Sequence, residues 1–296
     1  MLKIKPVSEK DANREVAEIY KSIKNSLDLY TVPLIFQYFA IFPEYLFHIW
    51  HQFQQNINDH SFNLYCLDIS NSAVTAIKEI YKPSAPTALF LEEMEENAQI
   101  IELRKFAVNS IKVNSRLYLL SVAIRESLKG KYLGLKQIGQ KIENQEEEIL
   151  KDLSNEFYSS HFENKKETTD DSNISGRQKE LDTIKRGGLT KSYTEEFFKL
   201  ITMEMERLAK NEDYLTRRVE LERFTLYKLP LLTNPIDSSL TTVFQKNFGN
   251  PYFPELIYLI SDLFPTQTPY KLLTSVVMKE TLKPHGVATP PTDGSR

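Results

Sequence analysis

Glycine and cysteine are scarce in this sequence, and long apolar runs are missing. Nine glycines among 296 residues are few for an architecture that needs many tight turns, which favours helices. The single cysteine, Cys66, excludes an internal disulfide and a multi-thiolate metal site. The longest strongly apolar stretch, residues 33–42, is about half of the roughly 20 residues that a membrane-spanning helix requires. We therefore expect no membrane association. Because residues 1–10 are charged and lack the apolar centre of a secretory signal, we expect a cytoplasmic protein.

An excess of basic residues is also missing. The chain carries 37 Lys and Arg against 40 Asp and Glu, a formal net charge of −3, and it has no basic stripe with interleaved aromatic residues. Nucleic acid is therefore not an expected partner. The motifs GxSxG, HExxH and CxxC and a phosphate-binding loop do not occur, which leaves the common hydrolase, zinc-protease, kinase-like and thiol-redox classes without support.

Helical periodicity is what the sequence does contain. From Asp11 onward one stripe of apolar residues has the spacing of an amphipathic helix: Val16, Ile19, Tyr20, Ile23 and Leu27. Pro43 suits the first turn of a further helix, EYLFHIWHQFQQNI. Similar patterns predict helices over about 66–82, 88–108 and 115–128. The predicted fold class is all-α.

Three segments recur in the same order along the chain. EIYKSIKNSL (18–27) matches EILKDLSNEF (148–157), EYLFHIW (44–50) matches EEFFKLI (195–201), and LLSVAIRESL (119–128) matches LTSVVMKETL (273–282). The offsets are 130, 151 and 154 positions, so they grow slowly. This pattern predicts a duplicated helical unit, about 8–130 and 142–285, with extra residues in the second copy and a pseudo-twofold axis between the copies.

The duplication predicts the division of the chain. Residues 1–130 form the first repeat, and residues 131–190 contain the first helix of the second repeat (142–158) followed by a polar insertion. Residues 191–285 complete the second repeat. The insertion holds too few apolar residues to offset its ordering entropy, so we expect it to be mobile, and we expect the tail 286–296 to be disordered.

A crevice between two such repeats is a natural place for a small ligand, although side chains could equally fill it. Asn114 and its counterpart Thr268 each precede a predicted helix, and Pro269 suits the first helical position after Thr268. Helix capping explains both polar residues. Contact with a ligand is the alternative interpretation.

The segments IYKSIKNSL, VP and FPEYLFHIW, then NSRLYLLSVAIRESL and the final VVMKETL helix, resemble the group I 2-haloacid dehalogenases. This resemblance covers most of the chain. It implies an all-helical fold of two repeats and hydrolysis of short 2-haloalkanoic acids to 2-hydroxy acids, in which water displaces the halide. It also implies a small carboxylic acid as ligand and no metal or organic cofactor.

The resemblance also implies roles for individual residues. The asparagine that holds the attacking water in this family falls on Asn114. The apolar wall of the substrate site falls on Thr31 or Leu34 in the first copy and on Phe264, Thr268 and Leu272 in the second. Phe36 is a further candidate for this wall, and a place in the core is its alternative interpretation.

The family's general base, an aspartate, has no clear counterpart. Counting back from FFKLITMEM leads to Gly187, and counting forward from EILKDLSNEF leads to residues 163–165, so neither position is an aspartate. Without a base the reaction loses a factor of about 10² to 10⁴ in rate. The candidate substitutes lie in or beside the polar insertion, where charge is otherwise typical of a solvated loop: Glu163, Asp170, Asp171 and Asp182. A catalytically inactive relative that binds a small carboxylate or a protein partner is the alternative function.

Glu44, His48 and His51 lie on one face of a predicted helix, at a spacing that could supply metal ligands. The second copy has Lys199 and Thr202 in place of the histidines, which indicates an exposed face instead, so we predict no metal site. The aromatic-rich helices would allow a homodimer.

Overall fold

Every regular element in the described part of this computed structural model is a helix. The structure describes residues 4–94, 99–131, 133–134 and 191–283. The elements are α1 (Arg14–Leu27), α2 (Leu34–Phe39), α3 (Pro43–Ile57), α4 (His60–Ile80), α5 (Ala85–Met94), α6 (Gln99–Leu128), α9 (Lys191–Leu208), α10 (Glu212–Lys228), the 3-10 helix η1 (Leu229–Leu231), α11 (Leu240–Lys246), α12 (Phe253–Tyr258), the π-helix η2 (Leu259–Leu263) and α13 (Phe264–Thr281). The chain divides into two compact units, Met1–Lys136 with Phe197–Arg296, and Gln137–Glu196. All of these elements except the start of α9 belong to the larger unit.

Local sequence signals explain where several helices begin. The Asn13 side chain accepts a hydrogen bond from the Val16 N–H at the start of α1, and Asp59 does the same for Phe62 at the start of α4. Pro43 occupies the first turn of α3, as predicted. The whole predicted apolar stripe of α1 is buried. These early helices confirm the periodicity argument.

The second half of the described chain repeats the element order of the first half. α3, α4 and α5 are followed by the long helix α6, and α9, α10 and α11 are followed by the helical stretch α12–η2–α13. The starts of α4 and α10 are 152 positions apart, and those of α6 and α12 are 154 positions apart. The same kind of side chain caps α4 and α10, Asp59 and Asn211. The repeat boundaries stay a prediction, because residues 142–158 lie outside the described residues, as does the tail 286–296.

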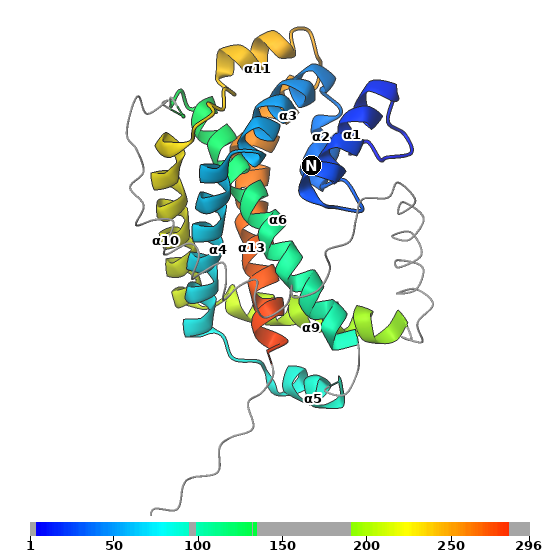
Figure 1. The fold of residues 1–296 in the computed structure, drawn as a ribbon, viewed down its shortest axis with the longest axis vertical. Coiled ribbons are helices and arrows are strands. Elements are labelled where there is room, and N and C mark those ends of the chain that lie inside the picture. The colour runs from blue at the N-terminus through cyan, green and yellow to red at the C-terminus, as the bar shows by residue number, and fades with distance from the viewer. Residues whose placement is uncertain (1–3, 95–98, 132, 135–190, 284–296) are drawn as a thin grey trace, which may run out of the picture. The chain divides into compact units, whose positions relative to one another are not determined.

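α6 and α13 run antiparallel and pack against each other over much of their length (Figure 1). Asn114 Nδ2 donates to Ser275 Oγ at 2.8 Å, and the hydroxyls of Ser121 and Thr268 lie 2.6 Å apart. Thr268 is the counterpart of Asn114, and Ser275 is the counterpart of Ser121, each 154 positions later. The two contacts are therefore exchanged between the copies, which is the pattern that an approximate twofold axis between α6 and α13 produces.

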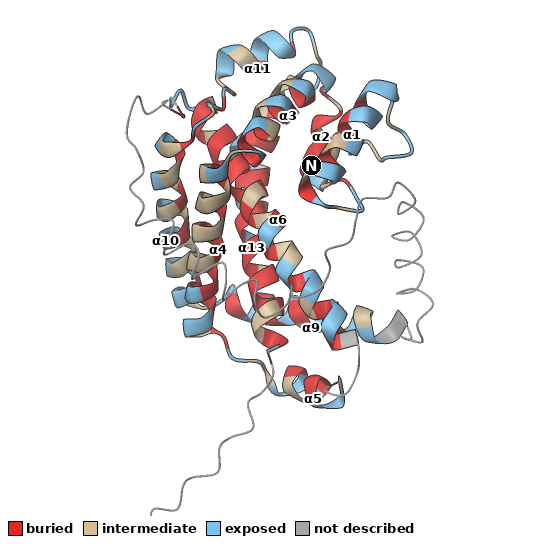
Figure 2. Ribbon diagram, viewed as in Figure 1, coloured by how far each residue is buried: buried red, intermediate tan, exposed pale blue. Residues whose placement is uncertain are grey.

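The core follows from this pairing. α13 buries residues on most of its circumference, and the buried sides of α4 and α6 face it (Figure 2). Phe39 of α2 packs edge-on against Phe264 of α13, with ring centroids 5.3 Å apart. Among the described helices, none combines the length and the apolar character that crossing a bilayer requires.

Two predicted helix boundaries are wrong. The patterns over 88–108 and 115–128 correspond to a short α5 and one continuous helix, α6, so Asn114 lies in mid-helix and does not cap it. Asparagine is usually favoured at caps over helix interiors, but here its amide bonds across to Ser275 instead of to its own backbone.

The capping interpretation is wrong for Thr268 as well, because α13 begins four residues earlier at Phe264. α13 also runs through Pro265 and Pro269, so Pro269 does not occupy the predicted first helical position. Pro265 is in the first turn, where a missing N–H is harmless. At Pro269 the helix continues because it is buried and because the Thr268 hydroxyl, by donating to the Phe264 carbonyl at 2.8 Å, adds a bond next to the one that proline removes.

Candidate functional site

Asn114 lies half-buried at the middle of α6, where α6 crosses α13. Its Nδ2 group donates to Ser275 Oγ at 2.8 Å and is 3.4 Å from the Lys271 carbonyl. The Ser275 hydroxyl in turn donates to that same carbonyl at 2.9 Å. Within the described residues the Asn114 Oδ1 atom accepts no hydrogen bond. The amide nitrogen therefore donates to α13, and the amide oxygen can still accept a hydrogen bond.

Lys271 lies one helical turn before Ser275 on the same face of α13, and its residue is exposed overall. Partial desolvation of its ammonium group lowers the pKa of Lys271, because removal from water disfavours the charged form. A bound anion would offset that cost. Sequence reasoning missed both Lys271 and Ser275, although the match of Ser275 to Ser121 in the third repeated segment is a signal for the latter.

The predicted wall residues of the second copy lie on α13 and are buried: Phe264, Thr268 and Leu272. The Thr268 hydroxyl is used internally, by Ser121 and by the Phe264 carbonyl. Leu272 is fully buried and lies one turn before Val276 and three residues before Ser275. The structure thus brings the second-copy candidates onto the helix that Asn114 contacts.

The first-copy candidates lie around α2. Phe36 is fully buried, with its ring centroid 5.6 Å from Trp50 and 6.3 Å from Phe53, so it belongs to the aromatic core of α2 and α3. Thr31 and Leu34 are exposed, just before α2 and at its start. A substrate role for these three residues stays a prediction.

The candidate bases Glu163, Asp170, Asp171 and Asp182, and the aligned Gly187, all lie outside the described residues. Two buried carboxylates lie within them, Glu126 and Glu204. Glu204 is occupied by the start of α5: its Oε1 accepts from the Ser84 backbone N–H at 2.8 Å and from the hydroxyls of Ser84 and Thr87. These bonds lower the pKa of Glu204 against the opposing effect of burial.

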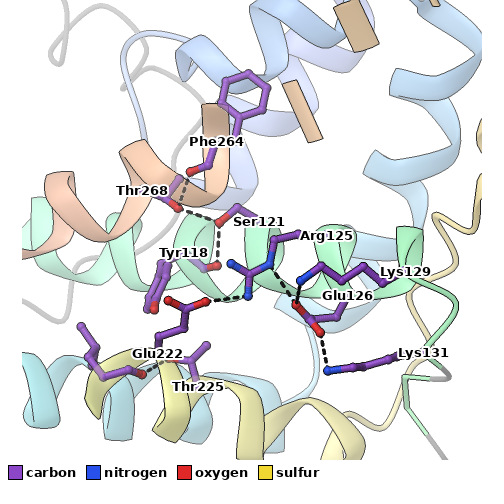
Figure 3. A network of polar contacts seen from close by, with 11 residues as sticks. Tyr118, Ser121, Arg125, Glu126, Lys129, Lys131, Glu222, Thr225, Phe264 and Thr268 are labelled. Carbon is purple, nitrogen blue, oxygen red and sulfur yellow. Dashed lines mark hydrogen bonds and ion pairs between the residues drawn. The ribbon is translucent and has the colours of Figure 1, made fainter. Parts of the chain in front are cut away.

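Glu126, at the end of α6, is held by three basic groups (Figure 3). Its Oε1 lies 2.9 Å from both Arg125 Nε and Lys129 Nζ, and its Oε2 lies 2.5 Å from Lys131 Nζ. Burial opposes ionisation, but the lysine hydrogen bonds and the nearby positive charges prevail and lower its pKa to about 2. A carboxylate of that pKa is a weak base at neutral pH, so Glu126 is a structural group.

The predicted exposed face of α3 is confirmed for Glu44 and His51, which are exposed. His48 Nε2 is 2.7 Å from the Asp237 carbonyl oxygen and 2.7 Å from Gln52 Nε2, so its ring links α3 to the segment before α11. No group of three metal-ligating side chains gathers anywhere in the part of the chain that the structure describes.

A shallow cavity of about 230 Å³ lies between α4 and α10. Arg217 lines it and forms ion pairs with Glu79 and, at 2.9 Å, with Glu220. An anion entering this cavity would have to compete with two carboxylates for the same guanidinium group. The α6–α13 contact around Asn114 is therefore the stronger candidate site.

Comparison with known proteins identifies the family of the chain. The sequence model of the family described as halocarboxylic acid dehydrogenase DehI matches residues 30–197, which is more than half of the chain. The chain belongs to this family. The match begins just before α2 and includes Asn114, and the expected kinship with 2-haloacid dehalogenases is thereby confirmed.

Solved structures similar to this DehI-family chain include a D-2-haloacid dehalogenase mutant, with a TM-score of 0.69 and 18% identity. A complex of D-2-haloacid dehalogenase with L-LA gives 0.65 and 17%, and a complex of a mutant with D-2-CPA gives 0.67 and 18%. Each match covers 96% of this chain and 98% of the other. The all-α fold is thus confirmed. No curated protein sequence matches the chain significantly.

Proposed function

We propose that this protein hydrolyses short 2-haloalkanoic acids to 2-hydroxy acids by direct displacement of halide with water. The observation that carries the proposal is Asn114, which in a chain of the DehI family presents beside α13 an amide oxygen that no other described residue uses. The structural likeness to proteins named D-2-haloacid dehalogenases supports the same reaction class.

In this proposal the Asn114 Oδ1 atom accepts a hydrogen bond from the attacking water and thereby fixes the direction of the water's lone pair. The water oxygen forms a bond to C2 from the side opposite the halogen, and halide leaves with the bonding electron pair. One water proton passes to a carboxylate base, for which we propose one of Glu163, Asp170, Asp171 and Asp182. The product is the 2-hydroxy acid with inverted configuration, and the reaction consumes no metal or organic cofactor.

The carboxylate end and the alkyl end of the ligand would contact different groups of the protein. Lys271 is suited to the substrate carboxylate, because its exposed cationic side chain starts one helical turn from Ser275, the hydrogen-bond partner of Asn114. The buried apolar side chains of Phe264 and Leu272 are suited to the short alkyl chain.

Halide release from purified protein tests the proposal. Both enantiomers of 2-chloropropionate should be supplied, and lactate should appear in equal amount to chloride. We expect release from at least one enantiomer and a loss of about 100-fold or more in kcat on Asn114→Ala. No release from a panel of short 2-chloro and 2-bromo acids would overturn the enzymatic proposal and favour an inactive binding scaffold.

We also propose that the protein forms a homodimer in the cytoplasm. Equilibrium sedimentation of the full chain tests the assembly, with twice the 34.4 kDa chain mass as the expected result. A single 34.4 kDa species at micromolar concentration would contradict it.

A further inference from the structure

The hydroxyl group of Ser275 is fixed in one role by its neighbours. A serine hydroxyl has one hydrogen to donate. Ser275 is buried, and its hydroxyl donates that hydrogen to the Lys271 carbonyl at 2.9 Å. Towards Asn114, 2.8 Å away, the Ser275 oxygen can therefore only accept.

This restriction decides the orientation of the Asn114 amide. An amide has a donating NH₂ end and an accepting oxygen end, and only the NH₂ end satisfies an acceptor. The Lys271 carbonyl, 3.4 Å from the same Nδ2 atom, favours the same orientation. The amide oxygen must then point away from Ser275 and Lys271.

We infer that Ser275 is a positioning residue for the reaction, which holds the Asn114 amide with its oxygen presented to the reacting water. The inference rests on the proposed function. Ser275 does not touch the water itself. It disfavours the flipped orientation of the Asn114 amide, in which the NH₂ group would face the water and could not accept a hydrogen bond from it.

The pseudo-twofold counterpart of this contact provides a matched control. Ser121 and Thr268 form the exchanged contact, at 2.6 Å, with Ser121 Oγ also 2.9 Å from the Tyr118 carbonyl. Ser121 is as buried as Ser275 and lies on the partner helix of the same pair. Removing the Ser121 hydroxyl breaks a cross-helix hydrogen bond of the same kind without touching Asn114.

The experiment compares Ser275→Ala with Ser121→Ala in halide release and in thermal unfolding. We expect Ser275→Ala to lower kcat about tenfold or more with KM changed less than about threefold, and Ser121→Ala to lower Tm at least as much while kcat stays within about twofold. Ser275→Thr, which keeps the hydroxyl, should restore most of the lost kcat. If Ser275→Ala does not fold, Ser275→Cys fills the same space with a weak acceptor and should show the same loss of kcat.

The double variant Asn114→Ala/Ser275→Ala separates positioning from general damage. If Ser275 acts through Asn114, its removal has no further effect on kcat once Asn114 is absent. Equal losses of kcat in Ser275→Ala and Ser121→Ala, or a further loss in the double variant, would overturn the inference and leave the proposed function standing. Full activity of Asn114→Ala would overturn the role of Asn114 and the inference with it, and absence of turnover in the wild-type protein would overturn the function itself.

Discussion

α6 and the stretch α12–η2–α13 hold equivalent places in the two halves of the described chain, yet they are built differently. α6 is a single α-helix of 30 residues, whereas its counterpart passes through a five-residue π-helix and then through Pro265 and Pro269. A π-helical turn inside an α-helix is frequently found at functional sites. Here it ends at Leu263, eight residues before Lys271, the first of the two α13 residues that contact Asn114.

The difference continues in the side chains at the crossing. Asn114 leaves an amide oxygen unused among the described residues, while the Thr268 hydroxyl is occupied by Ser121 and by its own helix. A duplicated scaffold would offer two equal sites, but of the pair Asn114 and Thr268 it is Asn114 that keeps an acceptor unused by the described residues. We therefore expect one ligand site per chain, with α13 as its wall.

The largest effect should come from Asn114→Ala, with Asn109→Ala as the control on the same helix. We expect the first variant to lose about 100-fold or more in kcat and the second to stay within about twofold, because Asn109 is on α6 but away from Ser275. Both variants should unfold within a few degrees of the wild-type protein. A loss of activity in both variants would mean that α6 as a whole, and not the Asn114 amide, matters for turnover.

Thr268→Val should have its main effect on stability. Valine keeps the shape of threonine but removes the hydroxyl 2.6 Å from Ser121, which should cost about 1.5 kcal/mol in the free energy of unfolding, since Ser121 keeps the Tyr118 carbonyl as its acceptor. Thr274→Val is the matched control, since Thr274 donates to the carbonyl four residues earlier but has no cross-helix contact among the described residues. We expect less than about 0.5 kcal/mol there, measured by urea denaturation. If the two variants lose equal free energy of unfolding, the exchanged contact between Ser121 and Thr268 stabilises the fold no more than a local hydrogen bond does.

Sequence reasoning predicted the parts of this structure that depend on local patterns. The apolar stripe of α1 and the proline at the start of α3 identified their helices because burial of one face and the missing proline N–H are properties of a few neighbouring residues. The repeat was visible because LLSVAIRESL and LTSVVMKETL still share their packing surface.

The errors concern contacts between distant residues. Asn114 was assigned as a helix cap because a capping side chain bonds to backbone groups only a few residues away. Its actual partner, Ser275, is 161 positions away. Lys271 becomes a candidate for the site only when α13 is placed beside α6. The general base cannot be assigned from sequence spacing, since counting from the helix before the insertion and counting from the helix after it lead to different residues.

The ends of the two equivalent helices give a further contrast, at Glu126 and its counterpart Glu280. Glu126→Gln should cost about 1–2 kcal/mol at pH 7, a discounted value because the side chains of Lys129 and Lys131 are 55% and 59% exposed and are screened by water. The folded pKa of about 2 lies below the ordinary value of 4.5, so the unfolded chain binds more protons between these values. This stabilisation is complete above about pH 4.5 and is lost as the pH falls towards 2. The difference between the wild-type protein and Glu126→Gln should therefore shrink over that range, which urea denaturation from pH 2.5 to 7 can follow.

Glu280→Gln should have the smallest effect. One oxygen of Glu280 pairs with Lys283, whose side chain is 44% exposed, and the other, Oε1, is buried without a hydrogen-bond partner among the described residues. Removing a charge that is so poorly satisfied should change the free energy of unfolding by less than about 1 kcal/mol, and a gain in stability is the expected direction because a buried unpaired carboxylate oxygen is unfavourable. Urea denaturation of Glu280→Gln beside Glu126→Gln measures the contrast directly. If Glu280→Gln costs as much as Glu126→Gln, then the two helix ends are equivalent in energy, and the asymmetry between the copies is confined to the crossing at Asn114 and Thr268.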